Sequence, residues 1–173
     1  MTTLRVFRCY RRLKRPYTRK SRFKRYNFIR AMPNHKITRF DMGDMSQNYP
    51  NFVKLMSKVD INIRHNAIEA SRMIINRELQ EKIGKIGYKF KINKYPHHAL
   101  RENKMLGGAH ADRIQTGMAH SFGKVVSLAV RWKKGTPLFT AQVKDLHVEI
   151  AKKALLSIAP KLPCKVFVVV DKK

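Results

Sequence analysis

The stretch that decides the fold reads VKLMSKVDINIRHNAIEASRMIINRELQEKIG and runs from Val53 to Gly84. Its first part, Val53–Arg64, alternates apolar and polar residues, which places three apolar side chains on one face: Val59, Ile61 and Ile63. A two-residue period is typical of a strand with one buried face. The second part, Ala67–Ile83, changes to the 3.6-residue period of a helix. The sequence therefore predicts a strand followed at once by an amphipathic helix.

The predicted helix has signals at both ends. Asn66 stands three residues before Glu69, a pair that resembles a capping box. Gly84 follows the last periodic residue, as is usual at a helix C-terminus. The face expected to point toward the core is formed by residues at helical spacing: Ile68, Ser71, Ile75, Leu79 and Lys82 or Ile83.

Alternating patterns elsewhere predict further strands. These are expected at Lys36–Met42, from Tyr88 to an end at Pro96, and at Lys124–Trp132, Pro137–Lys144 and Cys164–Val170. Lys134 and Gly135 predict a hairpin turn, and Asp145 is expected to cap a second helix that ends at Ala159. Strands and helices in this order favour an α+β fold, with a largely antiparallel sheet and two helices packed on one face. We expect one domain over 36–173, after an arm at 1–35.

The composition points to a polyanionic partner. The 173 residues include 38 Lys and Arg against 11 Asp and Glu, a formal net charge of +27. Lys and Arg that pair with phosphates release condensed counterions, so strong and salt-sensitive binding to RNA or DNA is expected. Val166–Val170 is the one dense apolar run and is far shorter than the roughly 20 residues of a spanning helix. The basic N-terminus lacks the apolar core of a signal peptide, which favours a cytoplasmic protein.

The arm is the most basic part of the chain. The first forty residues contain no acidic side chain, and aromatic residues lie between the basic ones. Such a segment cannot bury enough apolar surface to fold alone, so we expect an extended arm that becomes ordered against its partner. Its aromatic rings can stack on bases. An unpaired polycation at the N-terminus is therefore expected to bind nucleic acid rather than serve only solubility.

The longest predicted loop runs over 96–124. Loops of this length inside a compact domain are usually functional or disordered. Glycines in the loop allow close approach to a ligand, and its Arg, Asn, Lys and Gln side chains can contact phosphates and base edges. We therefore expect this loop to carry a specific function.

Several longer strings in the arm, the helix start and the loop resemble one known family. They are Arg8-Cys9-Tyr10-Arg11, Lys20-Ser21-Arg22-Phe23, Arg64-His65-Asn66-Ala67, Pro96-His97-His98, Arg101-Glu102-Asn103-Lys104-Met105, Ala111-Asp112-Arg113, Gln115-Thr116-Gly117-Met118 and Phe122-Gly123-Lys124. Together they resemble the large-subunit ribosomal protein family called L-ten-e in archaea and eukaryotes and L-sixteen in bacteria. The length resembles the archaeal branch. His110, Ala119 and His120 depart from the family pattern.

The resemblance implies a structural protein without catalytic residues or cofactors, bound to large-subunit rRNA beside the A site. Its partners would be this rRNA, A-site tRNA and neighbouring ribosomal proteins, and its loop would extend toward the peptidyl transferase centre. The residues assigned to rRNA contact are Arg5, Arg8, Arg11, Arg12, Lys14, Arg15, Tyr17, Arg19, Lys20, Arg22, Phe23, Lys24, Arg25, Arg64 and His65. Those assigned to the tRNA-proximal loop are His97, His98, Arg101, Asn103, Lys104, Gly107, Gly108, His110, Arg113, Gln115 and Lys124.

Two other classes compete with this interpretation. A metal-dependent RNA-processing enzyme could use His97, His98 and Asp112, but adjacent histidines on an extended segment point to opposite sides and seldom share a metal. Cys9 and Cys164 lie far apart without a Cys-x-x-Cys partner, so no zinc site is predicted. A free DNA-binding protein of the chromatin type is the third possibility. The long loop and the aromatic residues of the arm argue against it.

Overall fold

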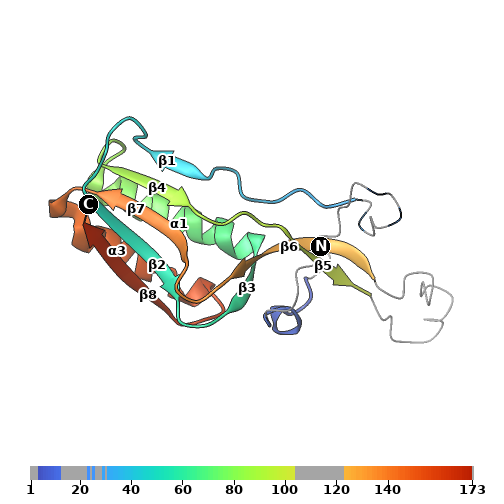
Figure 1. Ribbon diagram of the computed structural model, residues 1–173. Helices are drawn as coiled ribbons and strands as arrows, with labels where there is room; N and C mark the ends of the chain where they lie inside the picture. Colours follow the sequence, from blue (N-terminus) through green and yellow to red (C-terminus); the bar gives the residue numbers. More distant parts are fainter. Residues whose placement is uncertain are drawn as a thin grey trace.

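The described residues form two antiparallel sheets and two helices, which confirms the predicted α+β class (Figure 1). The computed structural model describes residues 4–12, 23, 25, 29, 31–103 and 123–172. The larger sheet has five strands in the order β1 (Asp41–Gly43), β4 (Tyr88–Ile92), β7 (Pro137–Val143), β2 (Asn51–Ser57) and β8 (Val166–Lys172). The smaller sheet has three strands in the order β3 (Ile61–Arg64), β6 (Lys124–Trp132) and β5 (His98–Glu102).

Both helices pack on one face of the five-stranded sheet, as predicted. Helix α1 (His65–Ile83) contacts β4, and α3 (Val148–Leu156) contacts β2 and β8; the two helices also contact each other. The face of α1 that the sequence predicts is buried at Ile68, Ser71, Ile75 and Leu79. Opposite it, the rings of Phe90 and Phe139 stack with centroids 5.6 Å apart. This arrangement encloses the main core between the helices and the sheet.

The strand predicted over Val53–Arg64 is wrong in its extent, because it consists of two strands in different sheets. Ser57 ends β2: its hydroxyl donates to the carbonyl of Val59 and accepts from the Val59 N–H. Such local side-chain bonds compete with the ladder bonds of a strand. Val59 is consequently exposed, whereas Ile61 and Ile63 are buried after the chain has entered β3. This turn connects β2 of the five-stranded sheet directly to β3 of the smaller sheet.

The predicted hairpin at Lys134 and Gly135 is also wrong. A turn is present, but β6 belongs to the three-stranded sheet and β7 to the five-stranded one. Asp60 accepts a hydrogen bond from the Lys134 N–H at 2.6 Å, and the Trp132 indole donates to the Thr136 carbonyl at 2.7 Å. These bonds fix the turn as a corner between the sheets.

The predicted caps are not formed. Helix α1 already begins at His65, and the Glu69 carboxylate is bound by the Arg72 guanidinium at 2.6 Å and by Thr38 instead of by a backbone group near Asn66. Asp145 lies in a 3-10 helix, η4 (Asp145–His147), and accepts from the Asn51 amide at 2.9 Å. Both carboxylates therefore join separate segments of the fold.

Several strand bounds differ from prediction. The first strand is only Asp41–Gly43, the strand from Tyr88 ends at Ile92, and the last strand begins at Val166. The last strand, β8, is a half-exposed edge strand that pairs with β2. The second helix ends at Leu156 and is followed by the three-residue 3-10 helix η5 (Ala159–Lys161). Within the predicted 96–124 loop, the structure forms β5.

His65 lies in the interior at the start of α1. It is 4% exposed, and its Nε2 atom lies 3.3 Å from the hydroxyl of Ser127, which is also buried. Burial, followed by the positive charges of Lys36 and Arg64, lowers the His65 pKa from 6.5 to about 4. The imidazole is therefore neutral at physiological pH.

This pKa predicts an acid-sensitive contribution to stability. Because the folded-state pKa lies below the unfolded one, the stabilisation is present above pH 6.5 and is lost as the pH falls from 6.5 toward 4. Between pH 7 and pH 5, the unfolding free energy should fall by about 2 kcal/mol more in the wild type than in His65→Gln. Denaturant titration at both pH values measures the difference. The exposed-residue control His97→Gln should behave as the wild type; equal pH dependence of His65→Gln and wild type would contradict the prediction.

Candidate nucleic-acid interface

The root of the arm, residues 4–12, is held against the smaller sheet by Asn62. The Asn62 N–H donates to the Arg11 carbonyl at 3.0 Å, and its side-chain amide donates to the carbonyls of Tyr10 and Arg12, both at 2.9 Å. Asn62 is 1% exposed, and β3 is an edge strand of its sheet. The arm thus covers the free edge of β3 and accepts hydrogen bonds from a buried NH2 group that would be costly to leave unpaired.

Aromatic and cationic side chains add to this anchor. The Arg64 guanidinium donates to the Arg5 carbonyl at 3.0 Å and lies over the rings of Phe7, at 5.2 Å, and Tyr10, at 6.0 Å. The Tyr10 hydroxyl donates to the carbonyl of Arg101 on β5 at 2.8 Å. Residues Phe7–Cys9 form the 3-10 turn η1. This part of the predicted arm is therefore folded onto the body instead of being extended.

Apart from the side chains of Phe7 and Tyr10, these contacts use the main chain of the arm root and leave its arginine side chains exposed. Arg5, Arg8, Arg11 and Arg12 are all exposed. Arg8, Arg11 and Arg12 line a cavity of about 430 Å³ together with Asn62 and His98. None of these three arginines forms an ion pair within the described part of the chain, whereas acidic residues of the body do so with nearby lysines and arginines. The cavity offers several guanidinium donors to one anion such as a phosphate.

The strands that flank residues 104–122 form a two-stranded neck. Strands β5 and β6 pair antiparallel up to Glu102 opposite Lys124, and they extend away from the five-stranded sheet in Figure 1. Gly123 closes the neck with a φ of 71°; a Cβ atom there would lie 2.6 Å from the Glu102 carbonyl carbon. A side chain at this position would therefore collide with backbone. Arg101 and Lys124 lie at the base of the segment that the neck presents.

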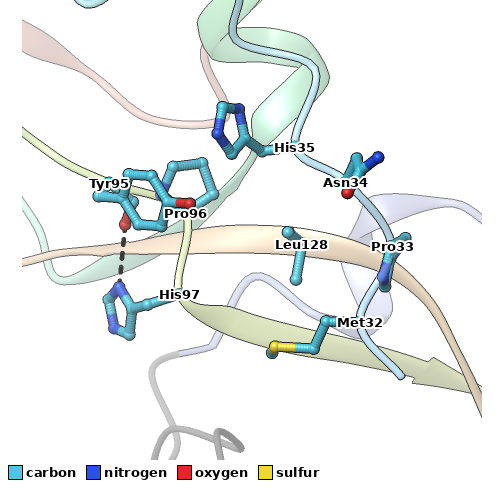
Figure 2. A pocket seen from close by; sticks show the side chains of 8 residues that line it. All are labelled: Met32, Pro33, Asn34, His35, Tyr95, Pro96, His97 and Leu128. Atoms are coloured by element: carbon cyan, nitrogen blue, oxygen red, sulfur yellow. Dashed lines mark hydrogen bonds between the residues drawn. The ribbon is translucent and has the colours of Figure 1, made fainter. Parts of the chain in front are cut away.

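The two adjacent histidines lie in different surroundings. His97 is exposed, and its Nδ1 atom lies 3.0 Å from the Tyr95 carbonyl (Figure 2). His98 is half-buried, which lowers its pKa, and His97, Arg131 and Arg101 lower it further. No group of three His, Cys, Asp or Glu side chains able to hold a metal occurs in the described residues. The different surroundings of His97 and His98 offer no support for a metal ion bound by both.

Other predicted contact residues fall into three groups. Phe23, which is 65% exposed, Arg25 and Asn103 are exposed. His65 and Arg64 act within the fold: the buried His65 cannot reach an external ligand in this conformation, and Arg64 holds the arm. The remaining predicted residues lie outside the described part of the chain: Lys14, Arg15, Tyr17, Arg19, Lys20, Arg22, Lys24, Lys104, Gly107, Gly108, His110, Arg113 and Gln115.

Asn62 was missed by sequence reasoning. It occupies the polar side of an alternating pattern, where an asparagine gives no sign of burial. Its role depends on an edge strand meeting a segment about fifty residues earlier in the chain. Only the free edge of the smaller sheet reveals this requirement.

Among the described residues, neither α1 nor α3 combines the length and the apolar character needed to span a membrane.

Comparison with known proteins gives a family. Residues 13–169 match the family described as ribosomal protein L16p/L10e. The large ribosomal subunit protein uL16 of Methanococcus aeolicus is 44% identical over 170 residues, which cover 98% of this chain and 95% of that protein. The protein of the same name from Archaeoglobus fulgidus is 43% identical over 165 residues, covering 95% of this chain and 91% of that protein. The resemblance found in the sequence is thereby confirmed, and the chain belongs to the ribosomal protein L16p/L10e family.

Proposed function

We propose that this constituent of the large ribosomal subunit binds large-subunit rRNA through its anchored arm and presents the segment between β5 and β6 to A-site tRNA near the peptidyl transferase centre. Its location in the large subunit follows from the family. The members compared with it are structural ribosomal proteins, so the chain is not an enzyme. Neighbouring ribosomal proteins are further partners.

The observation that carries the rRNA proposal is the way Asn62 holds the arm. Its three hydrogen bonds engage backbone carbonyls, while the side chains of Arg8, Arg11 and Arg12 remain exposed around one cavity. Because the main chain is fixed, less conformational entropy is lost when these guanidinium groups meet phosphates. The arrangement supports a preorganised phosphate contact at the arm root, from which the rest of the arm continues into the RNA.

The distribution of ion pairs supports the same orientation. Acidic side chains on the five-stranded sheet and its helices are neutralised in pairs such as Lys54–Asp171, at 2.6 Å, and Lys172–Asp145, at 3.2 Å. The described arm root carries only positive charge. A polyanion that approaches the arm root therefore meets no acidic side chain there.

The tRNA part of the proposal is supported by the neck. The paired strands β5 and β6 extend away from the five-stranded sheet and bring Asn103 close to Gly123, the two residues that flank the intervening segment. A rigid base is a common way to position a binding loop. Arg101, Asn103 and Lys124 are predicted loop residues that lie at this end of the neck.

The arm root predicts a measurable loss of phosphate contacts. The slope of log K against log salt for an rRNA fragment is expected to be negative. Replacing Arg8, Arg11 and Arg12 by Gln should reduce its magnitude by about 2 to 3, because up to three phosphate contacts disappear. The matched control replaces three exposed lysines at the opposite end or on α3: Lys85, Lys144 and Lys153. Equal slopes for the two triple variants would contradict a specific role for the arm root.

Removal of the Asn62 side chain tests the anchor without changing the charge. In Asn62→Ala, two hydrogen bonds to arm carbonyls are lost. Trypsin should therefore cleave at residues 8–12 roughly tenfold faster than in the wild type, while the cleavage rate at other sites stays unchanged. Affinity for rRNA should fall with the loss of order. Asn48→Ala, at an exposed position, is the control. An unchanged cleavage rate at the arm would show that Asn62 does not hold it.

Gly123 tests the contribution of the neck to tRNA binding. Gly123→Ala should distort the neck because its Cβ meets the Glu102 backbone, so ribosomes carrying the variant should bind A-site tRNA several-fold more weakly while retaining the protein. Gly135→Ala is matched, since Gly135 has a similar φ of 73° but no atom within 4 Å of an added Cβ. Filter binding of tRNA measures both. Normal A-site binding with Gly123→Ala would contradict the tRNA role.

A further inference from the structure

A second cavity lies between the end of the arm and the connection from β4 to β5 (Figure 2). Its volume is about 640 Å³. Figure 2 shows Tyr95 and Pro96 on one side of it and Met32, Pro33 and Asn34 on the other, with Leu128 of β6 between them. We name it the Tyr95 pocket. Volumes of this size accommodate small organic groups.

The Tyr95 pocket has an exposed aromatic wall. Tyr95 is 58% exposed, although its ring stacks on Phe40 with centroids 5.7 Å apart and meets His35 edge-on at 5.2 Å. One side of the ring system is thus supported by the fold, which limits its rotation. An exposed, immobilised ring loses little conformational entropy when another flat group stacks on it.

Polar groups accompany this aromatic wall. The Nδ1 atom of His35 is buried and has no hydrogen-bond partner in the part of the chain that the structure describes. The amide of Asn34 is exposed at the opposite side, and His97 lies below Tyr95. Amide and imidazole groups next to a flat apolar surface match the requirements of a nucleobase, which has a π-face and hydrogen-bonding edges.

The charge around the pocket favours RNA as the source of that base. No lining residue is acidic, and Lys36 and Lys94 directly adjoin lining residues in the chain. One wall belongs to the arm and the other precedes the neck, the two segments assigned to nucleic acid. We propose that the Tyr95 pocket receives one unpaired nucleobase of the rRNA that the arm binds. The inference rests on the proposed rRNA binding and adds a stacking site to it.

The test compares Tyr95 variants on one rRNA fragment that the wild type binds. Tyr95→Ala should weaken binding to the fragment by roughly tenfold, whereas Tyr95→Phe, which retains the ring, should bind nearly as the wild type. Binding to fully paired RNA should be the same for all variants. Ile86→Ala, which removes a 69% exposed apolar side chain far from the pocket, is the control and should change nothing.

Photo-crosslinking with wild-type protein provides a readout that is independent of variant folding. RNA containing 4-thiouridine or 6-thioguanosine should crosslink to peptides that include residues 32–35 or 95–97. If the wild type fails to bind the rRNA fragment, the proposed function itself is wrong. If the wild type binds but Tyr95→Ala binds equally well and no crosslink reaches these peptides, only the pocket is overturned. Competition by millimolar AMP or UMP, without a preference for unpaired bases in RNA, would also overturn it by identifying a free nucleotide as the ligand.

Discussion

The buried side chain of Asn62 holds the root of the cationic arm against the folded body. With 1% of its surface exposed, Asn62 could not leave its N–H groups unpaired without a substantial cost. The carbonyls of Tyr10 and Arg12 accept from its side-chain NH2 group, and the carbonyl of Arg11 accepts from its backbone N–H. The same contact covers an edge strand that would otherwise be open to another chain. A requirement of the core is thereby met by the segment proposed to hold the RNA, so anchoring the arm also stabilises the fold.

The corner between the two sheets gives this anchor its position. Ser57 ends β2 and Asp60 fixes the turn at Lys134, so β3 and β6 leave the body together. β6 then pairs with β5 to form the neck. The arm root, the Tyr95 pocket and the neck all lie on or beside the smaller sheet, and the five-stranded sheet with its helices serves as the rigid base. The chain has a formal net charge of +27. At the arm root, Arg8, Arg11 and Arg12 form no ion pair among the described residues, so their charges remain available to a polyanion.

Local patterns in the sequence were sufficient for the features that depend on neighbours along the chain. The buried face of α1, including Ile75 and Leu79, follows from helical spacing, and the α+β class follows from the order of the elements. Features set by distant partners were not predictable. Glu69 has the spacing of a capping residue, yet Arg72 and Thr38 occupy its carboxylate. His65 was assigned to RNA within a family string, but its place in the chain gave no measure of its burial beside Ser127.

The candidate site also has one part that the sequence predicts and one part that only the structure reveals. Charge identifies the arm and its class of partner without any structure, because electrostatic attraction to a polyanion depends little on the fold. The Tyr95 pocket has no such signal: Pro33, Tyr95 and Leu128 lie in three separate segments, and only their convergence creates a stacking surface. Phosphate contacts alone would hold RNA in many registers, since every phosphate is alike. One base held against a supported aromatic ring would fix the register, and the direction in which the neck points would then be fixed with it.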